Sequence, residues 1–122
     1  MELDWKNLGF GIMKTDYNVR CVYKDGSWGE LEVSSDEYLP IHIGATCLHY
    51  GQESFEGLKA FKGKDGRIRL FRHKENANRM IASAKGILLA EVPVGLFMEA
   101  VEKVVMLNKR FVPPDGTCLL YT

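Results

Sequence analysis

The stretch LKAFKGKDGRIRLF, residues 58–71, predicts an antiparallel β-hairpin and decides the fold class of the chain. Its first five residues form a strand that leads into Lys64-Asp65-Gly66, a strong turn signal. Residues 67–71 lead out of the turn and alternate charged with apolar side chains, which is the period of a half-buried strand. The fold is therefore expected to contain an antiparallel sheet.

A second hairpin is expected on the N-terminal side of the first. Residues 19–23 alternate with the same period, and Asp25-Gly26 follows at once. Glycine adopts the positive φ that a tight hairpin turn needs. Leu31 and Val33, two residues apart, mark the return strand, and residues 34–50 are interpreted as irregular because they carry Pro40 and polar residues.

Two helices are expected after the hairpins. The first has an apolar stripe at spacings of three and four and should end near Gly86, and the second should begin at Pro93 and stop at Pro113-Pro114. The first stripe consists of Ala77, Met80, Ile81, Ala84 and Leu88. The second buried face consists of Val94, Phe97, Met98, Val101, Val104 and Val105, with Glu99, Glu102 and Lys103 turned to water.

Residues 117–121 again have the pattern of a strand, and the sequence ends inside it. Strands grouped before helices predict an α+β fold, a two-layer domain in which two helices pack on a mainly antiparallel sheet. A length of 122 residues suits one such domain, residues 1–122. Because natural domains seldom end on an apolar run, we expect the sequence to be truncated at its C-terminal end.

Composition excludes several classes of function. Sixteen basic residues balance sixteen acidic ones, so no global field favours a nucleic acid or a membrane surface. The sequence shows no signal peptide and no apolar run long enough to span a bilayer. Cys21, Cys47 and Cys118 are odd in number and far apart, which fits reduced thiols and a cytoplasmic protein. Cys47 and His49 could face a metal ion, but a buried thiol beside a polar loop residue is the favoured interpretation, and no metal site is expected.

A positively charged cluster spans residues 59–79, where eight Lys and Arg residues outnumber two acidic ones. It is either a solvated hairpin face or an anion site. Since Phe61 and Phe71 are assigned to the core, a single phosphate group suits the cluster better than a nucleic acid. Tyr50 and Phe55 are also assigned to the core, on the apolar character of their own side chains alone.

Four sequence blocks together resemble one family. They are His49-Tyr50-Gly51, then residues 55–61 (FEGLKAF), then residues 69–72 (RLFR), and then residues 76–80 (NANRM). In this order and spacing they are similar to the branched-chain amino acid aminotransferases, which are fold-type IV pyridoxal-phosphate enzymes. The resemblance covers the length of the chain and implies the small N-terminal domain of such an enzyme.

The resemblance also implies residue roles. Arg79 matches the arginine that holds the phosphate of pyridoxal 5'-phosphate, and Phe10, Phe55 and Tyr121 match aromatic residues that line the substrate side-chain pocket. Tyr50 matches a tyrosine that reaches across a homodimer interface into the neighbouring pocket. The implied substrates are small molecules: leucine, isoleucine or valine and 2-oxoglutarate, which give branched 2-oxo acids and glutamate.

The resemblance has limits within these 122 residues. None of the ten lysines matches the family lysine that carries the cofactor, so a C-terminal domain is expected to supply it and this polypeptide alone is expected to be inactive. No residue of the chain is assigned a catalytic role. Two alternatives stay open: another fold-type IV enzyme, such as a D-amino acid aminotransferase or an aminodeoxychorismate lyase, or a non-catalytic anion-binding module.

Overall fold

The computed structural model describes residues 12–114 and the backbone of residues 118–121. Its helices are α1 (Thr46–Tyr50), α2 (His73–Gly86) and α3 (Val94–Leu107), and the 3₁₀ turn η1 (Lys109–Phe111) follows α3. Its strands are β1 (Asn18–Arg20), β2 (Tyr23–Lys24), β3 (Ser27–Trp28), β4 (Glu32–Ser34), β5 (Leu58–Lys62), β6 (Ile68–Leu70) and β7 (Cys118–Tyr121). All pairings between these strands are antiparallel, which confirms the predicted α+β fold.

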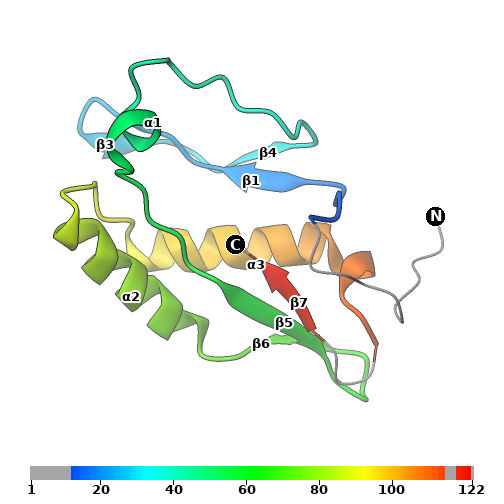
Figure 1. Cartoon of the computed structure of the whole chain (residues 1–122). Coiled ribbons are helices and arrows are strands. Elements are labelled where there is room, and N and C mark those ends of the chain that lie inside the picture. The colour runs from blue at the N-terminus through cyan, green and yellow to red at the C-terminus, as the bar shows by residue number, and fades with distance from the viewer. Residues whose placement is uncertain (1–11, 115–117, 122) are drawn as a thin grey trace.

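The largest sheet has three strands in the order β6-β5-β7. The predicted hairpin forms β5 and β6, with Ala60 opposite Leu70 and Phe61 opposite Arg69. The predicted C-terminal strand is β7, and it pairs with the other edge of β5 so that Leu58 lies opposite Tyr121. Figure 1 shows the result: β5 is the central strand, flanked by a local partner and by one from the far end of the chain.

The N-terminal hairpin forms as two short ladders. Strand β1 pairs with β4, and β2 pairs with β3 beside the turn. Both turn residues have positive φ, 51° at Asp25 and 84° at Gly26, as the tightest hairpin turns require. Tyr23 and Trp28 face each other across this turn with ring centroids 5.2 Å apart, a cross-strand aromatic contact that supports it.

Helix α3 connects the layers. It contacts α2 and β1, and its Val105 packs in one buried cluster with Ala60 of β5 and with Val112. The predicted buried face of α3 is confirmed, since all six of its residues are buried or half-buried. Ala77 and Ala84 of α2 are buried, as the first stripe predicted. None of the helices in the described part of the chain is both long and apolar enough to cross a membrane.

Several sequence-based expectations for the core are wrong. Leu88 is exposed with a positive φ of 57°, because α2 has already ended at Gly86 and the chain turns away. Phe71 is exposed because the chain leaves the sheet after Leu70 and turns at Arg72, which has a φ of 51°. Lys103, expected in water, is half-buried.

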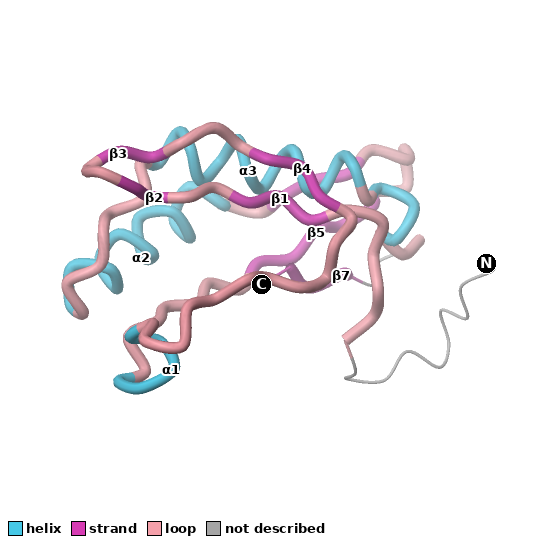
Figure 2. Tube along the Cα trace, turned by 90° about the horizontal axis from the view of Figure 1, so that it is seen from above, coloured by secondary structure: helices cyan, strands magenta, loops and turns pink. Residues whose placement is uncertain are grey.

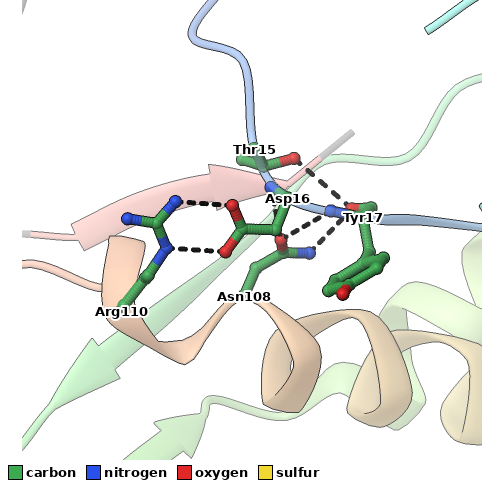
Figure 3. A network of polar contacts seen from close by, with 5 residues as sticks. All are labelled: Thr15, Asp16, Tyr17, Asn108 and Arg110. Atoms are coloured by element: carbon green, nitrogen blue, oxygen red, sulfur yellow. Dashed lines mark hydrogen bonds and ion pairs between the residues drawn. The ribbon is translucent and has the colours of Figure 1, made fainter. Parts of the chain in front are cut away.

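Helix α3 ends at Leu107, earlier than its expected stop at Pro113-Pro114. The reason is Asn108, a fully buried side chain whose four polar contacts close the helix end; Figure 3 shows those with Asp16 and Tyr17. Its Oδ1 accepts hydrogen bonds from the backbone N–H groups of Asp16 and Tyr17, both at 3.0 Å. Its Nδ2 donates to the carbonyl oxygens of Tyr17 at 2.8 Å and Val104 at 2.9 Å. Nearby, Arg110 forms a two-pronged ion pair with Asp16.

The segment between β4 and β5 is less regular than the rest, as expected, although its end forms the short helix α1. Figures 1 and 2 show that α1 and the chain before it lie to one side of α2 and α3. The end of the segment returns to α2, where Gln52 donates to the carbonyl oxygen of Ile87 and Ser54 contacts the sulfur atom of Met80. The segment carries a run of exposed apolar side chains, which are Tyr38, Leu39, Ile41, Ile43, Leu48, Tyr50 and Phe55. We call residues 38–55 the apolar arm. Apolar surface of this extent on one segment is typical of a surface that another protein part covers.

Candidate phosphate and substrate site

Arg79 lies on the outer face of α2, and its guanidinium is held by one carboxylate. Nε donates to Oε2 of Glu56 at 2.8 Å, and Nη2 donates to Oε1 of the same residue. The Arg79 side chain is 67% exposed, whereas the Glu56 side chain is 6% exposed. A two-pronged contact of this kind fixes the plane of the guanidinium as well as its position.

Asn76 fixes the carboxylate in turn. Its Nδ2 donates to Oε1 of Glu56 at 3.2 Å and to the carbonyl oxygen of Gly57 at 3.1 Å. Asn76 and Arg79 are three residues apart on a helix, so both face the strand-entry segment 55–57. The result is a connected set of three side chains that joins α2 to the start of β5.

The electrostatics of the set follow from these contacts. The hydrogen bonds from Arg79, with a smaller contribution from Asn76, hold the pKa of Glu56 below its ordinary value despite its burial. The hydrogen bonds that Arg79 donates to Glu56, together with the negative charge of Glu56, raise the pKa of Arg79 above its ordinary value. Glu56 is therefore ionised and Arg79 is charged throughout the physiological range.

The surroundings of Arg79 are positively charged. All eight Lys and Arg residues of the cluster between 59 and 79 are exposed, as the solvated-face interpretation and the anion-site interpretation both require. Arg69 is paired with Asp65, whose Oδ2 lies 2.6 Å from its Nη2. Arg79 differs from the others because its partner, Glu56, is a buried group that packs beside the sheet.

Tyr50 and Phe55 are exposed, which contradicts their assignment to the core. Their side chains are 85% and 81% exposed. Tyr50 ends α1, and Gly51 follows with a φ of 60°, a left-handed conformation that closes the helix and favours glycine. Phe55 lies in the extended segment just before Glu56. Apolar character predicted the wrong environment for these two residues, because both belong to the apolar arm and the described chain leaves most of each side chain uncovered.

The pairing of β5 with β7 places the backbone of Tyr121 near the Glu56–Arg79 pair. Tyr121 lies opposite Leu58, the first residue of β5, and Phe55 and Glu56 immediately precede that strand. Phe55, Tyr121 and the Glu56–Arg79 pair are thus attached to the same end of β5. The side chain of Tyr121 and the whole of Phe10 lie outside the described residues.

Cys47 and His49 were considered as possible ligands of a metal ion. Nε2 of His49 lies 2.5 Å from the carbonyl oxygen of Ile43, so a backbone contact already engages this ring. Cys47 is a half-buried free thiol. Within the described residues, no group of three or more His, Cys, Asp or Glu side chains is arranged to hold a metal ion.

Sequence reasoning singled out Arg79 but gave no role to Glu56, Asn76 or Asn108. Glu56 had a usable signal, since it lies between Phe55 and Gly57 in one of the blocks that carried the family resemblance. Its partner is 23 residues away in sequence, so no local pattern could have paired the two side chains. A guanidinium that is fixed on one edge and exposed elsewhere is well suited to bind a phosphate group.

No family model matches the chain, but curated relatives match almost all of it. It is 48% identical over 116 residues to a branched-chain-amino-acid aminotransferase of Haemophilus influenzae, which covers 95% of this chain and 34% of the relative. A branched-chain-amino-acid aminotransferase of Helicobacter pylori is 43% identical over 92% of the chain and 33% of the relative. A chloroplastic branched-chain amino acid aminotransferase of Humulus lupulus is 42% identical over 98% of the chain and 30% of the relative.

These relatives are named as amino-group transferases, that is, as transaminases. The chain belongs to the branched-chain amino acid aminotransferase family. It spans about a third of the length of the curated relatives that it matches.

Proposed function

We propose that residues 1–122 form the small N-terminal domain of a branched-chain amino acid aminotransferase. The complete enzyme transfers the amino group of leucine, isoleucine or valine to 2-oxoglutarate and acts in the cytoplasm. Further residues outside these 122 supply the lysine that carries pyridoxal 5'-phosphate. The observation that carries the proposal is the fixed, exposed guanidinium of Arg79 at the same end of β5 as Phe55 and Tyr121.

The donor set at Arg79 fits a phosphate group. Its guanidinium is permanently charged, its pKa is raised by Glu56, and it lies in an exposed region rich in Lys and Arg. Pyridoxal phosphate, when bound, supplies the electron sink that makes amino transfer possible. In this proposal Arg79 binds the phosphate and so orients the cofactor relative to the pocket.

The aromatic residues define the substrate class. In this proposal, which follows the family resemblance, Phe10, Phe55 and Tyr121 serve as an apolar wall of the pocket in the complete enzyme. Each branched side chain buried against such a wall gains roughly 1.5–3 kcal/mol. The exposure of Phe55 supports this role, because its ring is free to contact a ligand or another domain. A charged side chain at the same place would lose its hydration, so the wall favours leucine, isoleucine and valine.

The apolar arm supports a homodimeric enzyme. Tyr50 ends α1 on this arm with its side chain 85% exposed, as a residue that completes a neighbouring pocket needs to be. In the proposed dimer, Tyr50 enters the site of the other subunit, while Arg79 and Phe55 serve their own. Five further apolar side chains of the arm, Tyr38, Leu39, Ile41, Ile43 and Leu48, are buried at the same time, which explains their exposure here.

The proposal is tested on the complete enzyme by measuring the affinity for pyridoxal phosphate. Arg79→Ala should weaken binding about ten- to a hundredfold, since a charge-assisted contact is lost. Arg67→Ala is the matched control, because Arg67 is an exposed arginine of the same positively charged cluster. Equal effects of the two substitutions would show that the cluster as a whole, and not Arg79, binds the phosphate.

The substrate class is tested separately. The complete enzyme should transfer the amino group of L-leucine, and the 122-residue polypeptide alone should not. A preference for D-alanine over L-leucine would instead identify a different fold-type IV aminotransferase. Strongly salt-dependent binding of RNA or DNA by the polypeptide, without any transfer activity in the longer protein, would favour an anion-binding module.

A further inference from the structure

The guanidinium of Arg79 is occupied on one edge and open on another. A guanidinium has five N–H donors in a rigid plane: one on Nε and two on each Nη. Glu56 takes the edge formed by Nε and Nη2. Within residues 12–114, Nη1 contacts no acceptor, so the edge formed by Nη1 and Nη2 retains free donors toward solvent.

The occupied edge is anchored to the protein interior. The Glu56 side chain is 6% exposed, and Asn76 donates to its Oε1 at 3.2 Å while also donating to the carbonyl oxygen of Gly57. An unpaired arginine on a helix surface samples many rotamers and loses that freedom when it binds an anion. Here the rotamers of Arg79 are already restricted by a contact on the side that faces the protein.

We propose that Glu56 is a positioning residue: it holds Arg79 so that the Nη1–Nη2 edge is presented to the phosphate group of the ligand. The inference rests on the proposed function, in which Arg79 binds that phosphate. Glu56 does not touch the phosphate. It acts through Arg79, and Asn76 acts through Glu56.

Glu56 could also have the opposite effect on the affinity for phosphate. Glu56 is an anion on the guanidinium that the phosphate must use, so it could compete with the phosphate and weaken its binding. Two observations favour positioning. The carboxylate is buried and held by Asn76, so it cannot follow the guanidinium outward, and the contact it makes leaves a complete pair of donors unused. The surrounding excess of Lys and Arg also offsets one negative charge.

The experiment measures binding of inorganic phosphate to the cofactor-free complete enzyme by isothermal titration calorimetry. Glu56→Gln should weaken phosphate binding about three- to tenfold, the range expected when a long side chain must be ordered during binding. Asn76→Ala should also weaken it, although that variant keeps the Glu56 charge. The ¹⁵Nε–¹H signal of Arg79 should exchange with water faster in both variants, because the contact at Nε is weakened.

Asp65→Asn is the matched control. It removes one carboxylate from another two-pronged arginine contact in the same cluster, that of Arg69, whose Nη1 and Nη2 lie 2.9 and 2.6 Å from the two carboxylate oxygens. It should leave phosphate binding unchanged or slightly tighter, since it removes one negative charge from the cluster. A global effect of charge would instead make Glu56→Gln behave like this control.

Two results separate the possible failures. If Arg79→Ala leaves phosphate affinity unchanged, the proposed phosphate site is wrong and Glu56 has nothing to position. If Arg79→Ala weakens binding but Glu56→Gln and Asn76→Ala do not, Arg79 binds the phosphate and the positioning role is overturned. Tighter binding by Glu56→Gln would establish competition. Should Glu56→Gln fail to fold, Asn76→Ala still tests the positioning role, which an unchanged phosphate affinity and an unchanged exchange rate of the Arg79 Nε–H would overturn.

Discussion

Asn108 ties the end of α3 to the segment that enters β1, and its replacement by alanine should be strongly destabilising. The side chain is fully buried and its amide takes part in four hydrogen bonds. It accepts two from the N–H groups of Asp16 and Tyr17 and donates one to the carbonyl oxygen of Tyr17, as Figure 3 shows, and it donates the fourth to the carbonyl oxygen of Val104. Alanine leaves all four backbone groups without these partners. These contacts are part-buried, so water replaces them only incompletely, and the N–H groups of Asp16 and Tyr17 lose the acceptor that Asn108 provides.

The magnitude follows from the contacts. Each hydrogen bond contributes about 1 kcal/mol net, so the loss of all four amounts to about 4 kcal/mol, reduced to about 3 kcal/mol if a water molecule enters the small cavity. Such a loss is a large fraction of the total stability of a domain, which is about 5–15 kcal/mol. The midpoint of thermal unfolding should fall by about 10–15 °C for a chain of this size.

Urea unfolding followed by far-ultraviolet circular dichroism measures this loss, with Asn78→Ala as the control. Asn78 carries the same side chain but lies exposed on α2. Because alanine has the higher helix propensity, that substitution should be neutral or stabilise by a few tenths of a kcal/mol. The reasoning would be refuted by a loss below about 1 kcal/mol at Asn108, since a single net hydrogen bond already accounts for that much.

Two further predictions concern the acid stability of the chain and its assembly. The folded-state pKa of Glu56 is lowered by Arg79, so the stability from this contact is fully present above the ordinary value of 4.5 and is lost as the pH falls through the lowered folded-state pKa. Between neutral pH and pH values below 4.5, the original protein should therefore lose more stability than Glu56→Gln, and parallel losses would contradict the assignment. In the proposed dimer, an inactive Tyr50 variant and an inactive variant without the cofactor lysine should recover activity when their subunits exchange, because both defects then fall in one of the two sites. The recovered activity should approach about half that of the original per mixed dimer. Mixed dimers demonstrated by mass spectrometry, but without recovered activity, would place Tyr50 in the site of its own subunit.

Local patterns were sufficient for the two hairpins and for the existence of α2 and α3, but not for α1 or for the end of α3. The alternation in residues 58–71, the turn residues Asp25 and Gly26, and the apolar stripe of α3 each depend on neighbours within a few positions, and all are confirmed. The strand at 117–121 was also evident from its composition. These features arise from backbone preferences and from the periodic burial of one face, which a linear sequence records directly.

Sequence blocks added the family and the special status of Arg79. Four short segments in the right order identified the aminotransferase family, which the curated relatives confirm. In the structure Arg79 is exposed on its helix, as are the other basic residues of this cluster. Nothing local distinguished this arginine from the other basic residues between 59 and 79.

Tertiary structure alone decided which residues act together. The pairing of Glu56 with Arg79, the attachment of Asn108 to Tyr17 and the position of β7 beside β5 join residues that are distant in the chain. Tertiary structure also turned Tyr50 and Phe55 outward, although their apolar side chains had been assigned to the core. The physical reason is that burial depends on what the rest of the chain places against a side chain, whereas hydropathy describes only the side chain itself.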